Sequence, residues 1–173
     1  MGETGILGVD PGLRHTGWGL VAAAGNRLRF VAAGSFDPPA RLQMAERLAF
    51  LAGGLAGIIA QHQPDEAAVE ETFVNGNARA ALKLGQARGI ALLVPAQAGL
   101  PVAEYAANLI KKSVTGYGHA DKQQIQAMMR LLLAGIPADL TADAADALAI
   151  AVCHAHHRAA PAIMAIRNAR VSA

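Results

Sequence analysis

The sequence predicts an α/β fold built on a mixed five-stranded sheet with helices on both faces. Three β-prone runs fill the first 35 residues, and a long stretch with helical periodicity follows them. Strand-like and helical segments then alternate toward the end of the chain. A meander followed by alternating elements is typical of one sheet that helices cover on both sides.

The first three strands are predicted to form an antiparallel meander. An apolar run ends at Asp10, and Pro11-Gly12 then supplies a turn. Gly25-Asn26 is typical of a hairpin turn between the second and third strands. We expect these strands at residues 6–9, 17–23 and 27–35.

Helices alternate with strands in the remainder of the chain. Apolar residues recur at helical spacing from Arg41 to His62, and Pro64-Asp65 ends that pattern. Asp121 and Thr141 stand where N-caps would start two later helices. The predicted helices are 41–62, 78–93, 122–133 and 141–157, and the later strands are 66–71 and 101–105.

Length and composition favour one compact domain. The chain has 173 residues, of which 53% are hydrophobic and only 16% are charged. We expect a single domain at residues 1–158 and a flexible C-terminal tail at 159–173. The lone Cys153 suits a reducing compartment, and no apolar run reaches the ~20 residues that a bilayer requires. The expected location is the cytoplasm, with no membrane association.

Charge is unevenly distributed, although the net charge is only +2. Residues 111–130 carry four basic side chains against one acid, and three arginines but no acid follow Asp146. This segregation is compatible with a basic surface beside an acidic pocket, as a polyanionic partner would need. Ordinary solvated helix faces explain it equally well.

Two candidate metal ligands lie on predicted strands. Asp10 ends the first strand, where rigid backbone would hold a ligand at a crevice, although a turn-starting aspartate is an ordinary alternative. Glu70 lies in an apolar strand, where an ionised carboxylate is costly unless it is paired or bound to metal. Glu70 and Glu71 point to opposite faces, and periodicity leaves open which of them enters a site. A buried structural glutamate is the alternative.

Two further candidates, Asp143 and Asp146, lie three residues apart at the start of the last helix. This spacing places them side by side on one face. The helix dipole favours acids there, which is an innocent explanation. However, the flanking residues are almost all Ala and Leu, and two acids on a core-facing surface repel each other unless a cation lies between them.

These four carboxylates together suit a hard cation such as Mg²⁺ or Mn²⁺. Zinc is not expected, because the sequence lacks Cys and His at zinc-ligand spacing. His154, His156 and His157 suggest a second metal cluster at first sight. We interpret them instead as a polar helix end that complements the C-terminal dipole.

Four segments together resemble the RuvC family of Holliday-junction resolvases. They occur in the family's order, and the resemblance spans about residues 5 to 155. Any one of them alone would be weak, but the combination is highly specific. The segments are GVDPGLRHTGWG at 8–19, VEETF at 69–73, ALKLGQARG at 81–89 and ADAADALA at 142–149.

The resemblance implies an RNase H-like fold and a homodimer that nicks two strands of a four-way DNA junction symmetrically. It implies that Asp10, Glu70, Asp143 and Asp146 are the catalytic, metal-binding acids, which selects Glu70 over Glu71. Two Mg²⁺ or Mn²⁺ ions per site would then assist hydrolysis to 5′-phosphate and 3′-hydroxyl ends. The branch-migration proteins RuvA and RuvB are the expected partners.

Several side chains are expected to contact DNA. Lys111 and Lys122 match family lysines near the cleaved strand. Phe73 would stack on an unpaired base at the junction centre, unless it is a hydrophobic staple on the next helix. The remaining expected contacts are Asn75, Asn77, Arg79, Lys83 and Lys112.

Gly85 and Gly89 lie four residues apart on the predicted helix 78–93 and would let another helix approach closely. We expect this face to form the dimer interface, although packing against the chain's own sheet explains the glycines equally well.

Other functions remain open at this point. An RNase H-like nuclease acting on structured RNA and a non-catalytic junction-binding module are both alternatives. An ATPase of the actin and sugar-kinase type would share the turn after Asp10, but it needs a second domain for which 173 residues leave no room.

Overall fold

The computed structural model describes residues 2–71 and 77–158, and it contains one five-stranded sheet of order β3-β2-β1-β4-β5. The first three strands pair antiparallel, whereas β4 runs parallel to both β1 and β5. The predicted mixed sheet is therefore confirmed. The strands are β1 Thr4–Asp10, β2 Thr16–Ala24, β3 Arg27–Phe36, β4 Glu66–Glu71 and β5 Val102–Ala106.

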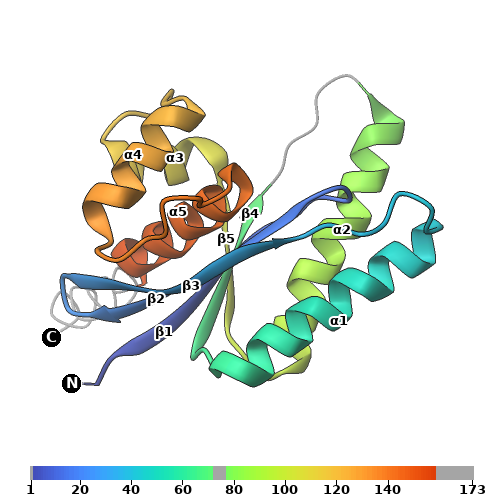
Figure 1. Ribbon diagram of the computed structural model, residues 1–173, viewed down its shortest axis with the longest axis horizontal. Coiled ribbons are helices and arrows are strands. Elements are labelled where there is room, and N and C mark those ends of the chain that lie inside the picture. The colour runs from blue at the N-terminus through green and yellow to red at the C-terminus, as the bar shows by residue number, and fades with distance from the viewer. Residues whose placement is uncertain (1, 72–76, 159–173) are drawn as a thin grey trace, which may run out of the picture.

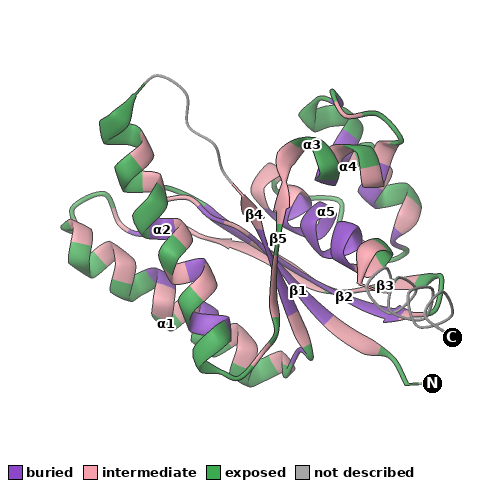
Figure 2. Ribbon diagram, turned by 180° about the vertical axis from the view of Figure 1, so that it is seen from behind, coloured by how far each residue is buried: buried purple, intermediate pink, exposed green. Residues whose placement is uncertain are grey.

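Helices cover both faces of the sheet, as expected (Figure 1). α1 and α2 lie on one face, and α3, α4 and α5 lie on the other. Each face has its own buried cluster of aliphatic side chains, and α5 carries the longest run of buried residues (Figure 2). The helices are α1 Met44–His62, α2 Ala78–Gln97, α3 Ala107–Thr115, α4 Lys122–Leu132 and α5 Ala142–His157.

Two helix predictions need correction. Helix α3 was not predicted, because it has only nine residues and its N-cap, Ala106, makes no side-chain capping bond. The second helix was predicted to end at Leu93, whereas α2 continues through Pro95 to Gln97. Proline removes one helical hydrogen bond, but Val94 and Pro95 are buried, which offsets that loss. The predicted tail, 159–173, lies outside the described residues.

Helix α5 packs unusually close to the sheet because glycines face it from β1 and β2. A Cβ on Gly8 would lie 2.1 Å from the carbonyl oxygen of Ala147. A Cβ on Gly17 would lie 2.0 Å from the carbonyl oxygen of Asp143. Any larger residue at these positions would push α5 away. The glycines therefore determine how near the start of α5 comes to the end of β1, where Asp10 lies.

The far end of α5 is tied to β4 and β5 by polar contacts. His154 is buried, and its two ring nitrogens lie 2.8 Å from Glu66 Oε2 and 2.8 Å from the Tyr105 hydroxyl. Arg158 donates two further hydrogen bonds to Glu66, at 2.9 and 2.5 Å. The three histidines lie in the last turn of α5 as expected, but His154 is buried and bonded to Glu66 and Tyr105. Among the described helices, none is both long and apolar enough to cross a bilayer.

Candidate active site

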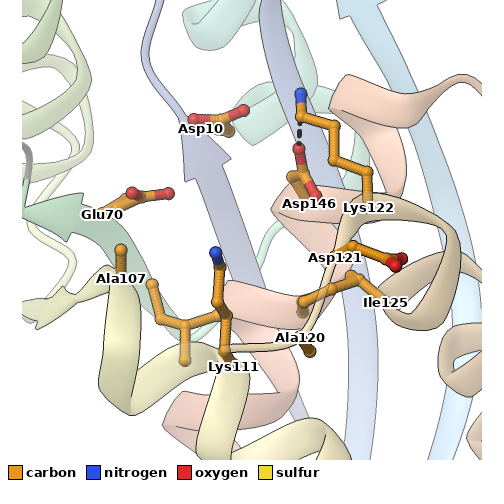
Figure 3. Close-up of a pocket in the computed structure, with 11 residues that line it drawn as sticks. Asp10, Glu70, Ala107, Lys111, Ala120, Asp121, Lys122, Ile125 and Asp146 are labelled. Carbon is orange, nitrogen blue, oxygen red and sulfur yellow. Dashed lines mark ion pairs between the residues drawn. The ribbon is translucent and has the colours of Figure 1, made fainter. Parts of the chain in front are cut away.

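A cavity of about 530 Å³ opens where β1 and β4 end and where α3, α4 and α5 converge (Figure 3). Its wall combines carboxylates and lysines with small apolar side chains, which leave room for a ligand. The lining residues are Asp10, Glu70, Ala107, Ile110, Lys111, Ala120, Asp121, Lys122, Ile125, Asp146 and Ala149.

Three of the four predicted acids form a tight cluster at this cavity. One carboxylate oxygen from each of Asp10, Asp143 and Asp146 lies within 4.8 Å of the other two. Asp10 is the last residue of β1, and the other two lie in the first turns of α5. Thr141 fixes that helix start, because its side chain accepts a hydrogen bond from the Ala144 N–H at 3.3 Å. The structure thus brings together residues that are far apart in the sequence.

Glu70, the fourth predicted acid, lies in the wall of the same cavity but outside the tight cluster. It is the fifth residue of β4, and its neighbour Glu71 alternates to the opposite face. The structure therefore points Glu70 toward the other acids, which the strand pattern alone had left open (Figure 3).

Burial and the charges of neighbouring acids raise the pKa values of Asp10, Glu70 and Asp146. Burial and then the charges of Glu70, Asp146 and Asp143 raise the pKa of Asp10 to about 7. Burial raises the pKa of Asp146, and burial followed by the charge of Asp146 raises the pKa of Glu70. Crowded carboxylates of this kind are stable in their ionised form when a cation lies between them. A site of carboxylate oxygens alone fits a hard divalent metal ion.

Two of the predicted DNA-contacting lysines line the cavity. Lys122 is the first residue of α4, and its Nζ lies 3.3 Å from Asp146 Oδ2, which raises the pKa of Lys122. Lys111 points into the cavity from α3, the helix that was not predicted from the sequence (Figure 3). Lys112 is exposed and does not line it.

The other predicted DNA contacts lie around the start of α2. Asn77 is its N-cap and accepts a hydrogen bond from the Ala80 N–H at 3.1 Å, and Arg79 is exposed. Lys83 lies apart from the main cavity, in a separate groove that Asp143 also lines. Phe73 and Asn75 fall outside the described residues.

Some residues of the cavity had no recognisable sequence signal. Ala107, Ala120 and Ala149 shape its wall, yet alanine is too common in this chain to attract attention. Asp121 was identified only as an N-cap, which it is, since it accepts a hydrogen bond from the Gln124 N–H at 2.9 Å.

Comparisons with known proteins agree with this geometry. The family model described as crossover junction endodeoxyribonuclease RuvC matches residues 6–154. The RuvC protein of Rhodopseudomonas palustris strain BisA53 is 60% identical over 157 residues, which are 91% of this chain and 90% of that protein. The RuvC protein of Paramagnetospirillum magneticum is 61% identical over 153 residues, covering 88% and 92% of the two chains.

Solved structures show the same likeness. Thermus thermophilus RuvC in complex with a Holliday junction substrate matches with a TM-score of 0.82 and 31% identity, over 90% of this chain and 94% of that one. The yeast mitochondrial Holliday junction resolvase Ydc2 matches with a TM-score of 0.62 at 13% identity, over 89% and 78% of the chains, which supports the fold alone. The expected RNase H-like fold is confirmed. The chain belongs to the RuvC family of crossover junction endodeoxyribonucleases.

Proposed function

We infer that the protein is a metal-dependent endonuclease that resolves Holliday junctions in DNA recombination and repair. The observation that carries this inference is the cluster of Asp10, Asp143 and Asp146, whose carboxylate oxygens approach within 4.8 Å in a chain of this family. The relative from Thermus thermophilus, at 31% identity, was solved on a Holliday junction substrate. A purely junction-binding protein would not need such a costly group of acids.

We propose that the four acids share two Mg²⁺ ions, or Mn²⁺ in their place. The charges of the other three acids all act on Asp10, so it is suited to bridge both ions, with Glu70 as a ligand of one ion and Asp143 with Asp146 as ligands of the other. Bound there, the ions would stabilise the attacking and leaving oxygens of an in-line phosphodiester displacement. The ends produced would be a 5′-phosphate and a 3′-hydroxyl, which a ligase can seal.

In this proposal the lysines of the cavity bind phosphates of the DNA strand. Lys111 and Lys122 extend from two different helices toward the acids (Figure 3). Lys122 is 3.3 Å from Asp146 and is therefore close enough to hold a phosphate that reaches the acid cluster. Each lysine that neutralises a phosphate releases a counterion, so binding should weaken with salt.

We also propose that the exposed face of α2 joins two copies of the chain. Leu82 is 68% exposed and Leu93 is 50% exposed, so α2 presents two large apolar side chains to solvent. Gly85 and Gly89 lie between them, and a Cβ on either would meet nothing within 4 Å. Packing against the chain's own sheet therefore does not explain these glycines. A second copy would cover the leucines and bring two active sites to one junction.

One comparison of substrates tests the function. The protein is incubated with a synthetic four-way junction, a linear duplex and an RNA hairpin, each with Mg²⁺, Mn²⁺ or a chelator. We expect paired nicks in the junction alone, only with metal, and none from Asp10→Asn. Equal cutting of the linear duplex would contradict the resolvase function. Cutting of the RNA hairpin alone would favour a structured-RNA nuclease, and binding without cutting would favour a junction-binding module.

The partners RuvA and RuvB stay a prediction from the family. A pull-down of the purified chain with each of these proteins, with and without junction DNA, would test it.

A further inference from the structure

A second groove, of about 350 Å³, adjoins the acid cluster, and neither Lys111 nor Lys122 lines it. Asp143 belongs to the acid cluster and also lines this groove, so the two sites meet at that residue. The turn between β1 and β2 forms one wall, and the start of α2 forms the other. The lining residues are Gly12, Leu13, Arg14, His15, Ala80, Lys83, Leu84 and Asp143.

The turn that forms the first wall is held rigidly from within. The buried Thr16 accepts a hydrogen bond from the Gly12 N–H at 3.3 Å, and its hydroxyl donates to the Gly12 carbonyl at 2.6 Å. The turn is also tight, since a Cβ on Gly12 would lie 2.2 Å from the carbonyl oxygen of His15. These contacts leave the backbone of the turn little freedom.

The same turn is also clamped from outside. Arg47 of α1 donates to the Leu13 carbonyl at 3.3 Å, and further bonds to the Ala40 and Leu42 carbonyls fix the guanidinium itself. On the other side, His15 Nδ1 lies 2.6 Å from Asp37 Oδ1. A surface turn held by this many long-range contacts is typical of a preorganised binding element.

Arg14 and Lys83 of this groove form no ion pair with the described residues, although His15 pairs with Asp37. Elsewhere Arg29, Arg88 and Arg158 each pair with a glutamate. Arg14 projects from the clamped turn and Lys83 from α2, so the two cations line opposite walls. A phosphate between them would receive a directional guanidinium and an ammonium.

We propose that Arg14 and Lys83 bind a backbone phosphate of the cleaved strand, one or two nucleotides from the scissile phosphate. This proposal rests on the proposed function and assigns the strand a path across the molecule. The strand enters past Lys111 and Lys122, crosses the acid cluster and leaves through the Arg14 groove. The cut phosphate is thereby held from both sides, which fixes its orientation at the acids.

Charge-neutral phosphates test this directly. A set of four-way junctions carries one methylphosphonate each, at successive positions around the cut, and single-turnover cleavage is measured for unaltered protein and for Arg14→Ala. On the all-phosphate junction we expect Arg14→Ala and Lys83→Ala each to cleave at least about tenfold more slowly, since each variant loses a hydrogen bond to a charged phosphate. The salt slope of binding should fall by about 1.

At one methylphosphonate position near the cut, the Arg14→Ala defect should vanish, because the contact is already lost. Arg27→Ala is the matched control: Arg27 is also exposed but begins β3 at the hairpin, and it should show no defect at any position. Arg14→Lys should recover part of the rate, and equal melting temperatures would show that the variants fold.

An Arg14→Ala defect of equal size on every modified junction, or no defect at all, would overturn the proposal. If the unaltered protein cleaved no junction, the proposed function would fail first, and this assignment would fail with it.

Discussion

The two faces of the sheet are built differently. On one face α5 is buried almost throughout from Ala144 to His154, and glycines of β1 and β2 let its backbone come into direct contact with the strands. On the other face α1 buries only Leu51 and Leu55, although both α1 and α2 are longer than α5. Large apolar side chains are exposed there, on α1 at Phe50 and on α2 at Leu82 and Leu93. On the other face Leu109 of α3 and Leu131 of α4 are also exposed, whereas α5, which is described throughout, exposes none.

This difference separates the face on which side chains must be placed accurately from the face that we propose binds a second copy of the chain. Metal ligands must be held within a fraction of an ångström, and the close packing of α5 holds the proposed ligands Asp143 and Asp146 near Asp10. The helices α1 and α2 carry none of the four acids. We propose that their exposed apolar surface is one half of the dimer interface.

The packing of α5 against the sheet should be easier to disrupt by a single substitution than the packing of α1 and α2. Gly8→Ala places a methyl group within 3 Å of the α5 backbone at Ala147 and Ala151. We expect a loss of about 3 kcal/mol in the free energy of unfolding, at the upper end for overpacking. Urea denaturation followed by circular dichroism measures this loss. Metal-dependent cleavage should also fall under conditions where the variant is still folded, because α5 is displaced.

Gly53→Ala on α1 is the matched control. A Cβ there meets nothing within 4 Å, and the position lies inside a helix. This variant should be more stable by about 0.5–1 kcal/mol, because alanine costs less backbone entropy than glycine. Equal destabilisation by both variants would contradict the contrast between the two faces.

Most of the fold could be predicted because its signals are local. The β4 strand was predicted with its observed bounds, 66–71, and the N-caps Asp121 and Thr141 lie where expected. The short α3 helix, 107–115, had no cap signal and depends on packing against α5. The extension of α2 past Pro95 likewise depends on burial that sequence periodicity does not show.

The site could be predicted less completely than the fold. Asp10 and Asp146 were expected from position and spacing, but the choice of Glu70 over Glu71 needed the family resemblance. The buried network around His154 was missed, because its partners Glu66 and Tyr105 lie 88 and 49 residues away in the chain. Contacts of this range follow from topology rather than from any local pattern.

The proposed dimer interface on α2 should be disrupted by a substitution that leaves the protein folded. Leu82→Asp places a charge on the exposed face of α2, where a second copy would have to bury it. We expect the dissociation constant of the dimer to rise roughly 30-fold, which corresponds to about 2 kcal/mol of binding free energy. Analytical ultracentrifugation measures the effect, with Leu131→Asp on the exposed face of α4 as the matched control.

An unchanged dissociation constant for Leu82→Asp would place the dimer interface elsewhere. A loss of folded structure in that variant would show instead that α2 needs Leu82 for its own packing.

The acid cluster should make stability depend on pH in the metal-free protein. The pKa of Asp10 is raised from 3.8 to about 7, so the folded state keeps a proton that the unfolded state has already lost. Stability should therefore fall as pH rises from about 4 to about 7. With a chelator present, we expect the melting temperature to drop by a few degrees over this range, more in the unaltered protein than in Asp10→Asn.

The exposed Asp139 offers a control, since Asp139→Asn should retain the full pH dependence. Mg²⁺ should stabilise the unaltered protein most at pH 8, where the acids bind it without first losing protons. A melting temperature that rises with pH in chelator would contradict the proposed electrostatics of the site.

The most direct test of the whole account uses a supercoiled plasmid with an extruded cruciform, which is a four-way junction in a closed circle. Two nicks within one bound complex give a linear plasmid, and one nick gives an open circle. With Mg²⁺, the unaltered protein should give linear product. Mixed dimers formed with excess Asp10→Asn should give open circles, because one site remains active. Linear product from the mixed dimers would contradict the claim that two copies, each with its own acid cluster, cut one strand apiece.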